Sequence, residues 1–130
     1  MTTAAPGFKL GTIGQIALTV SDLPRAVAFY RDALGLRQIP IEAPRLAFFD
    51  CAGVRLMLSL PETPDARVGG AVLYFKVADI QRAHEALSSQ GVTFVDAPHR
   101  IARLSDHDLW LAEFHDPAGN VLALMAEVPH

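Results

Sequence analysis

The chain contains the same short sequence unit twice. Residues 20–26 read V-S-D-L-P-R-A, and residues 77–83 read V-A-D-I-Q-R-A. Each copy follows an apolar segment typical of a strand and carries a signal for the N-cap of a helix, at Ser21 or Asp22 in the first copy and at Asp79 in the second. We therefore expect two modules of the same fold, each beginning with a strand and then a helix.

Apolar residues after each motif recur at the spacing of one helix face. They are Leu23, Ala26, Val27, Tyr30 and Leu34 in the first copy and Ile80, Ala83 and Leu87 in the second. Gly35 and Gly91 follow these stripes and mark the ends of the two helices.

The similarity between the copies continues beyond the helices. Residues 46–58 (L-A-F-F-D-C-A-G-V-R-L-M-L) match residues 111–124 (L-A-E-F-H-D-P-A-G-N-V-L-A-L) with one insertion, and each segment is typical of a β-hairpin that turns at an Ala-Gly pair. The pattern predicts an α+β fold of two tandem βαβββ modules whose mixed sheets curl into a cup. We expect a single domain over residues 1–130, with module 1 at about 13–60, a linker rich in Pro and Gly at about 61–70, and module 2 at about 71–127.

A further hairpin is predicted in the second module, from residues 98–104 and 109–115 with a tight turn at 105–108. Pairing Leu104 with Leu109 would set Arg100 opposite Glu113 on one face and leave the other face to His99, Ile101, Arg103, Trp110, Ala112 and Phe114. Trp110 and Phe114 then either belong to the core or stack on a ligand at the mouth of the cup. The turn residues Asp106, His107 and Asp108 are expected to be solvated, with a ligand-contacting loop as the alternative.

Composition excludes several classes of function. The formal net charge is -3, and no run of Lys or Arg provides a surface for nucleic acid or an anionic membrane. No apolar stretch approaches the roughly 18 residues of a membrane span, and residues 1–10 lack the apolar core of a signal peptide. Cys51 is the only cysteine, so no internal disulfide can form, and we expect a structural thiol in a cytoplasmic protein.

The duplicated V-x-D-[LI]-x-R-A motif and the segment D-P-A-G-N at residues 116–120 resemble the glyoxalase, bleomycin-resistance and extradiol-dioxygenase superfamily, also called the vicinal oxygen chelate superfamily. The resemblance covers residues 13–127 and implies the cup-shaped fold. It leaves the function open, because this superfamily includes lyases, isomerases, dioxygenases, thiol transferases and metal-free drug-binding proteins.

The resemblance also implies where a metal would bind. In metal-dependent members the ligands come from the first and last strands of each module, and these positions correspond here to Gln15, Met57, Val72 and Ala123. Divalent cations of this kind require several carboxylate or imidazole donors. Met57, Val72 and Ala123 provide neither. We expect no metal at this site and no cofactor, with a displaced set of His and acidic residues as the alternative.

The resemblance implies that the metal positions point into the cup, and strand alternation from them then assigns residues to the face of the sheet that lines the cup. That face mixes polar with small apolar residues, as a small-molecule site does, although Arg55 and Lys76 could instead reach solvent. Together with the hairpin, it gives these candidate ligand-binding residues: Gln15, Thr19, Arg55, Met57, Val72, Tyr74, Lys76, Trp110, Phe114 and Ala123.

Three functions remain open from the sequence. The leading hypothesis is a metal-independent protein that binds a small molecule, similar to the drug-sequestering branch of the superfamily, whose members are commonly homodimers with cups between subunits. The second is a lyase or isomerase that uses His99, Tyr74 or Lys76 for acid–base chemistry, or a displaced metal. The third is an inert scaffold whose cup is closed by packing.

Overall fold

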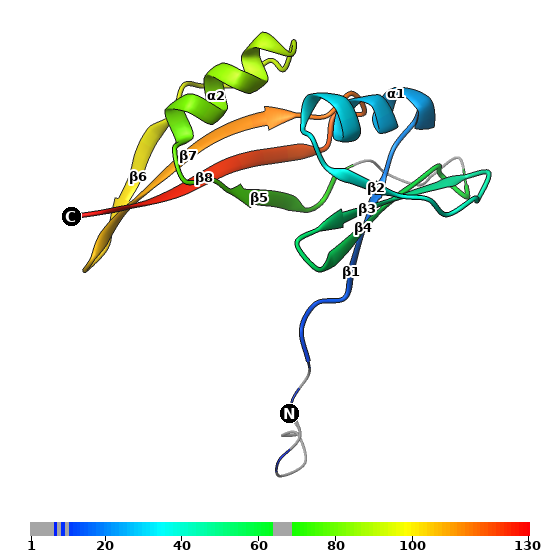
Figure 1. The fold of residues 1–130 in the computed structure, drawn as a ribbon, viewed down its shortest axis with the longest axis horizontal. Helices are drawn as coiled ribbons and strands as arrows, with labels where there is room; N and C mark the ends of the chain where they lie inside the picture. The colour runs from blue at the N-terminus through cyan, green and yellow to red at the C-terminus, as the bar shows by residue number, and fades with distance from the viewer. Residues whose placement is uncertain (1–6, 8, 10, 64–68) are drawn as a thin grey trace.

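The protein consists of two consecutive modules, each a strand, a helix and three further strands (Figure 1). The structure, a computed structural model, describes residues 7, 9, 11–63 and 69–130. The first module contains β1 (Gln15–Thr19), α1 (Leu23–Ala28), the π-helical continuation η1 (Phe29–Ala33), β2 (Arg37–Ile39), β3 (Leu46–Cys51) and β4 (Val54–Ser59). The second contains β5 (Val72–Lys76), α2 (Ile80–Ser89), β6 (His99–Arg103), β7 (His107–His115) and β8 (Val121–Pro129). Part of the expected linker, 64–68, and most of the N-terminal segment lie outside the described residues.

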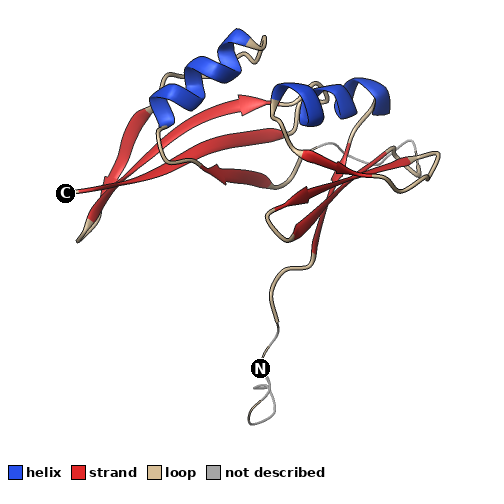
Figure 2. Cartoon of the chain, in the orientation of Figure 1, coloured by secondary structure: helices blue, strands red, loops and turns tan. Residues whose placement is uncertain are grey.

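Each module forms one four-stranded mixed sheet. The strand orders are β1-β4-β3-β2 and β5-β8-β7-β6, with the first strand of each module parallel to the last and the other pairs antiparallel. Figure 2 shows the helices on the same side of both sheets. The predicted α+β fold of tandem βαβββ modules is therefore confirmed. β1 and β5 are each an edge strand of their own sheet.

The helices begin at the two aspartates of the repeat. The side chains of Asp22 and Asp79 accept hydrogen bonds from the backbone N–H groups of Arg25 and Arg82, both at 3.1 Å. Each bond satisfies one of the donors that a helix leaves free in its first turn. The shared motif thus acts as a helix start signal in both modules.

Alternation along the strands separates a helix-facing side from an open face. The helix-facing side is the core, and its members include Leu18, Val20, Leu56, Leu58, Leu122 and Leu124 with Ala26, Tyr30 and Ile80 from the helices. We call the opposite side of each sheet the open face. On it Gln15 lies opposite Arg55 and Ala17 opposite Met57 in the first sheet, while Tyr74 lies opposite Ala123 in the second.

A buried polar cluster joins the two modules. Tyr30 Oη donates to Asp116 Oδ2 at 2.8 Å, and Asn120 Nδ2 donates to the same oxygen at 2.8 Å and to the carbonyl of Thr19 at 2.9 Å. Asp116 Oδ1 also accepts the backbone N–H groups of Ala118 and Asn120. The D-P-A-G-N segment therefore forms the turn before β8 and also binds the second module to the first through buried hydrogen bonds.

The hairpin of β6 and β7 differs from the predicted one. The N–H of Leu104 donates to the carbonyl of His107 at 2.8 Å, so Leu104 lies opposite His107 and β7 begins two residues earlier than expected. A register shift between Arg100 and Ala102 then sets His99 opposite Leu111 and Arg100 opposite Trp110. The predicted pairings of Leu104 with Leu109 and of Arg100 with Glu113 are wrong. An irregularity of this kind changes which side chains share a face, and simple alternation cannot reveal it.

Candidate ligand-binding site

Eight of the ten predicted ligand-binding residues lie on the open faces, divided between the two sheets. The first sheet carries Gln15, Thr19, Arg55 and Met57, and the second carries Val72, Tyr74, Lys76 and Ala123. The four positions that correspond to metal ligands are thus two pairs on separate sheets. In the part of the chain that the structure describes, no ladder joins β1 to β5. We call the group of predicted residues on each sheet a half-site.

The first half-site is organised around Gln15. Its Oε1 accepts a hydrogen bond from Arg55 Nε at 2.7 Å, and its Nε2 lies 3.9 Å from Met57 Sδ. Gln15 supplies the only oxygen donor among the four metal positions, and that oxygen is already bound by a cation. The positive charge of Arg55 would also repel a divalent metal. These residues therefore do not fit the superfamily's metal.

Arg55 is supported by an aromatic ring on the next strand. Its guanidinium carbon lies 5.5 Å from the ring centroid of Phe48, which is the cross-strand neighbour of Met57 on the open face. The nearby carboxylate of Asp50 belongs to a different pair, since it lies 3.3 Å from Arg37 Nη2 and accepts the N–H of Gly53. Among the described residues, no carboxylate forms an ion pair with Arg55.

The second half-site is more apolar, and it also contains Glu113, which was not among the predicted ligand-binding residues. Val72 and Tyr74 are 41% and 53% exposed, so the edge strand β5 presents large apolar side chains to solvent. Ala123 lies between Tyr74 and Glu113 on neighbouring strands. The repeat contained a signal for Glu113, because aligning residues 46–58 with 111–124 makes it the counterpart of Phe48.

His99 also lies toward the open face, on the far edge strand of the second sheet. Its Nδ1 is 2.9 Å from the carbonyl of Ala97, which can only accept, so Nδ1 is the donor in this contact and Nε2 is the acceptor nitrogen whenever the ring is neutral. Asp96 lies 3.6 Å from the same ring nitrogen. No carboxylate partner for this histidine is identifiable from the sequence alone.

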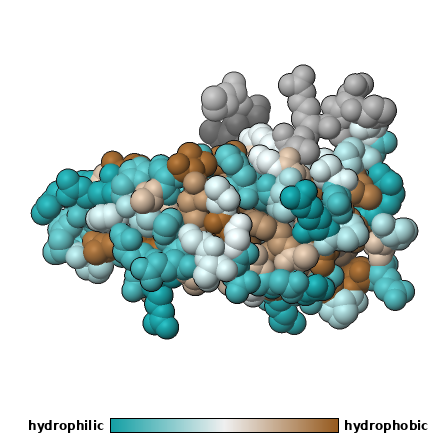
Figure 3. All heavy atoms as spheres, turned by 90° about the horizontal axis from the view of Figure 1, so that it is seen from above, coloured by the Kyte–Doolittle hydropathy of each residue, from teal (hydrophilic) through white to brown (hydrophobic). Residues whose placement is uncertain are grey.

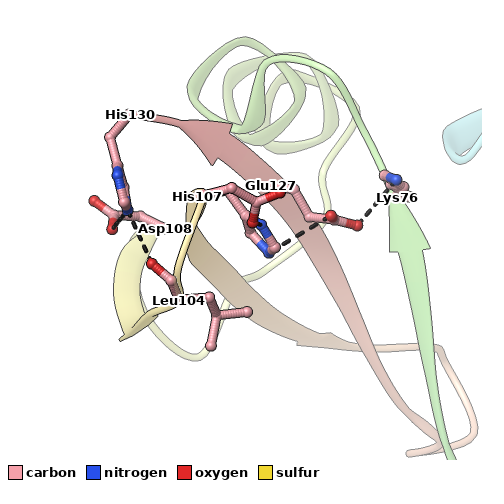
Figure 4. A network of polar contacts seen from close by, with 7 residues as sticks. Lys76, Leu104, His107, Asp108, Glu127 and His130 are labelled. Atoms are coloured by element: carbon pink, nitrogen blue, oxygen red, sulfur yellow. Dashed lines mark hydrogen bonds and ion pairs between the residues drawn. The ribbon is translucent and has the colours of Figure 1, made fainter.

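Lys76 is not a free cation on the open face. Its Nζ lies 2.9 Å from Glu127 Oε1, and Glu127 Oε2 lies 3.5 Å from His107 Nε2 (Figure 4). The hydrogen bond and charge of Lys76 hold the pKa of Glu127 below its ordinary value. Lys76 is thereby neutralised within its own sheet and is a weak candidate for binding a ligand.

The cluster at residues 106–108 is only partly a solvated turn. Asp106 is 83% exposed, but the side chains of His107 and Asp108 are 19% and 18% exposed at the start of β7. His130 Nε2 lies 3.3 Å from Asp108 Oδ1 and 3.1 Å from the carbonyl of Leu104, as Figure 4 shows. Within the described ranges, no group of three His, Cys, Asp or Glu side chains is arranged to hold a displaced metal.

Trp110 and Phe114 lie on the helix-facing side, so the prediction that they share a ligand-binding face with His99 is wrong. Phe114 is fully buried, with its ring centroid 5.1 Å from that of Phe94 and 6.5 Å from that of Phe29. Trp110 packs against the same core. The register shift in β6 is the reason that His99 is separated from them.

A groove of about 830 Å³ runs beside the free edge of β5. All five β5 residues line it, together with apolar residues of the first module that include Ile16, Leu36, Val54 and Leu56. Seen from above, the molecule has apolar residues toward its middle and hydrophilic residues toward its ends (Figure 3). Part of the exposed apolar surface, including Val72 and Tyr74, therefore lies where the two modules meet.

Comparisons with known protein families and with solved structures indicate the same superfamily. The model of the Glyoxalase/Bleomycin resistance protein/Dioxygenase superfamily matches residues 12–124. The uncharacterized protein YraH of Bacillus subtilis is 30% identical over 126 residues, which cover 85% of this chain and 94% of YraH. No helix among the described residues is long and apolar enough to cross a membrane.

Solved structures share the whole fold. A superfamily member from Sphaerobacter thermophilus is 25% identical, with a TM-score of 0.75 over 91% of this chain and 98% of that chain. A lactoylglutathione lyase from Agrobacterium tumefaciens is also 25% identical, with a TM-score of 0.72 over 90% of this chain and 94% of that chain. The similarity thus extends over nearly the full length of each protein.

Proposed function

Because this chain belongs to the Glyoxalase/Bleomycin resistance protein/Dioxygenase superfamily, we propose that it is a cytoplasmic protein that binds a small organic molecule without a divalent metal. One observation carries the proposal: the only oxygen donor left at the metal positions, on Gln15, is bound by Arg55. The space left by the small residues Ala17 and Ala123 on the open faces is then available to an organic ligand. Mixed polar and apolar lining is typical of such sites.

We further propose that the complete site forms in a homodimer. The open face of the first sheet in one subunit would oppose the open face of the second sheet in its partner, which would bring the two half-sites together. The unpaired edges of β1 and β5 support this arrangement, since an exposed apolar edge strand is normally covered. The groove along β5 offers the second copy an apolar surface to occupy.

The dimer is tested by placing a charge on the exposed edge strand. We expect the native protein to sediment at twice its 14.0 kDa mass at micromolar concentration, and Tyr74→Arg to sediment as a monomer, because burying an unpaired guanidinium in the interface is costly. Ile101→Arg is the matched control, since Ile101 is similarly exposed at 51% but lies on β6, and it should remain dimeric. A monomeric native protein in analytical ultracentrifugation would contradict the arrangement.

Ligand binding is tested with a variant that fills the cup. We expect ligand-observed NMR screening of a metabolite and antibiotic library to find binders of the native, metal-free protein, and Ala17→Trp to lose them because the indole takes up the space beside Met57. Ala28→Trp adds the same bulk at an exposed position of α1 and should bind normally. Hits that bind both variants equally would place the ligand elsewhere, and an empty screen would favour an inert scaffold.

A second candidate is an enzyme of the same superfamily that works by acid–base catalysis. It is favoured by His99, whose Nδ1 faces the carbonyl of Ala97 and lies 3.6 Å from the carboxylate of Asp96, so that Nε2 is the acceptor nitrogen when the ring is neutral. Such an enzyme would exchange a carbon-bound proton of its ligand with deuterated solvent. His99→Gln should abolish that exchange and leave ligand binding intact, whereas exchange that persists in the variant would exclude His99 as the base.

A further inference from the structure

We infer that Arg55 takes the electrostatic role of the missing metal, and that the ligand of the proposed site is a small organic carboxylate. The inference rests on the proposed function and specifies its ligand class. A bound divalent ion would attract electron-rich oxygens of a ligand to this part of the open face. Arg55 places a permanent positive charge beside the same position, because its Nε is hydrogen-bonded to Gln15, the residue at the first metal position.

The geometry of Arg55 leaves its binding edge free. A guanidinium has five N–H donors, of which Gln15 takes the one on Nε. No other side-chain hydrogen bond or ion pair of Arg55 is formed among the described residues, so Nη1 and Nη2 remain as a two-pronged donor. That edge matches the two oxygens of a carboxylate.

The side chain is also positioned before a ligand arrives. Gln15 fixes one edge of the guanidinium at 2.7 Å, and the ring of Phe48, which is 8% exposed, lies 5.5 Å beneath it. A group held in this way loses less conformational freedom on binding than a solvated arginine. Phe48 and Met57 beside it offer an apolar surface for the body of the ligand.

The other cations of the open faces cannot perform this role as well. Arg37 is paired with Asp50 at 3.3 Å, and Lys76 with Glu127 at 2.9 Å. Arg55 has the acidic neighbour Asp50 directly across the strand, but that carboxylate is already bound by Arg37 and by the N–H of Gly53. The charge of Arg55 is therefore the one left for a ligand among the described open-face cations.

The test uses the native protein and two probes with the same ring system, 1-naphthoate, which carries a charged carboxylate, and 1-naphthamide, which carries a neutral amide. We expect calorimetric titration to show at least tenfold tighter binding of the carboxylate, weakened by salt, as for a charge-assisted pair. Arg55→Met should remove this preference, and Arg55→Lys should retain part of it because the charge remains without the fork. Arg31→Met, which removes an arginine paired with Asp32 on η1, changes the net charge equally and should retain the full preference.

The outcomes separate this inference from the proposed function. If both probes bind with equal affinity and Ala17→Trp abolishes both, the binding site stands and the inference about Arg55 is overturned. A preference for the carboxylate that survives in Arg55→Met also overturns it. If neither probe binds the native protein, the carboxylate inference is wrong, and the library screen then decides whether the proposed site itself exists.

Discussion

Replacing Asp116 by alanine is expected to lower the free energy of unfolding by about 3 kcal/mol or more, since it removes several charge-assisted hydrogen bonds and leaves a buried hydroxyl unpaired. Asp116 is 4% exposed and accepts hydrogen bonds from Tyr30, Ala118 and Asn120. The Tyr30 hydroxyl donates to Asp116 Oδ2 at 2.8 Å, and burial followed by the charge of Asp116 raises the pKa of Tyr30 far above the ordinary value. The loss should be visible as a lower midpoint in urea unfolding.

A graded control distinguishes the cluster from a general effect of mutation. Tyr30→Phe removes one donor and leaves the carboxylate its other partners, so it should cost about 1–2 kcal/mol. If the free energy of unfolding of Asp116→Ala lay within about 1 kcal/mol of that of the native protein, the buried polar cluster would contribute little to stability. The joining of the modules would then depend on apolar packing.

Replacing Phe114 by alanine is the second substitution with a large expected effect. The side chain is fully buried against Phe94 and Phe29, so its removal should leave a cavity and lower the free energy of unfolding by about 3–5 kcal/mol. Ile101→Ala, at a position that is 51% exposed, should change stability by less than about 0.5 kcal/mol. A Phe114→Ala protein of native stability that failed to bind ligand would instead indicate that this ring lines the site.

The repeat made most of the fold predictable. The metal positions were implied by the resemblance to the family, and the spacing that aligned residues 20–26 with 77–83 related them in pairs. Alternation from Gln15 and Val72 then assigned the open faces of β1 and β5. Both inferences rely on regular strands, where side chains alternate without interruption.

The hairpin of β6 and β7 was not predictable in the same way. Its register depends on a shift between Arg100 and Ala102, which moves side chains to the other face without a clear mark in the sequence. The repeat nevertheless indicates that Phe114 is a core residue, because it aligns Phe114 with Phe49, which is buried in the core of the first module. The pair of Arg55 with Gln15 could not be predicted either, since it depends on a cross-strand register and on rotamers.

The central claim is that a guanidinium has replaced the metal at this site, and a titration with divalent metals tests it most directly. Untagged protein would be stripped with EDTA and titrated with Mn²⁺, Ni²⁺ and Zn²⁺, with elemental analysis of the protein as purified. We predict no ion bound at one per chain, because the only oxygen donor at the metal positions is held by Arg55. One tightly held ion per chain, lost in the Gln15→Ala variant, would contradict the account.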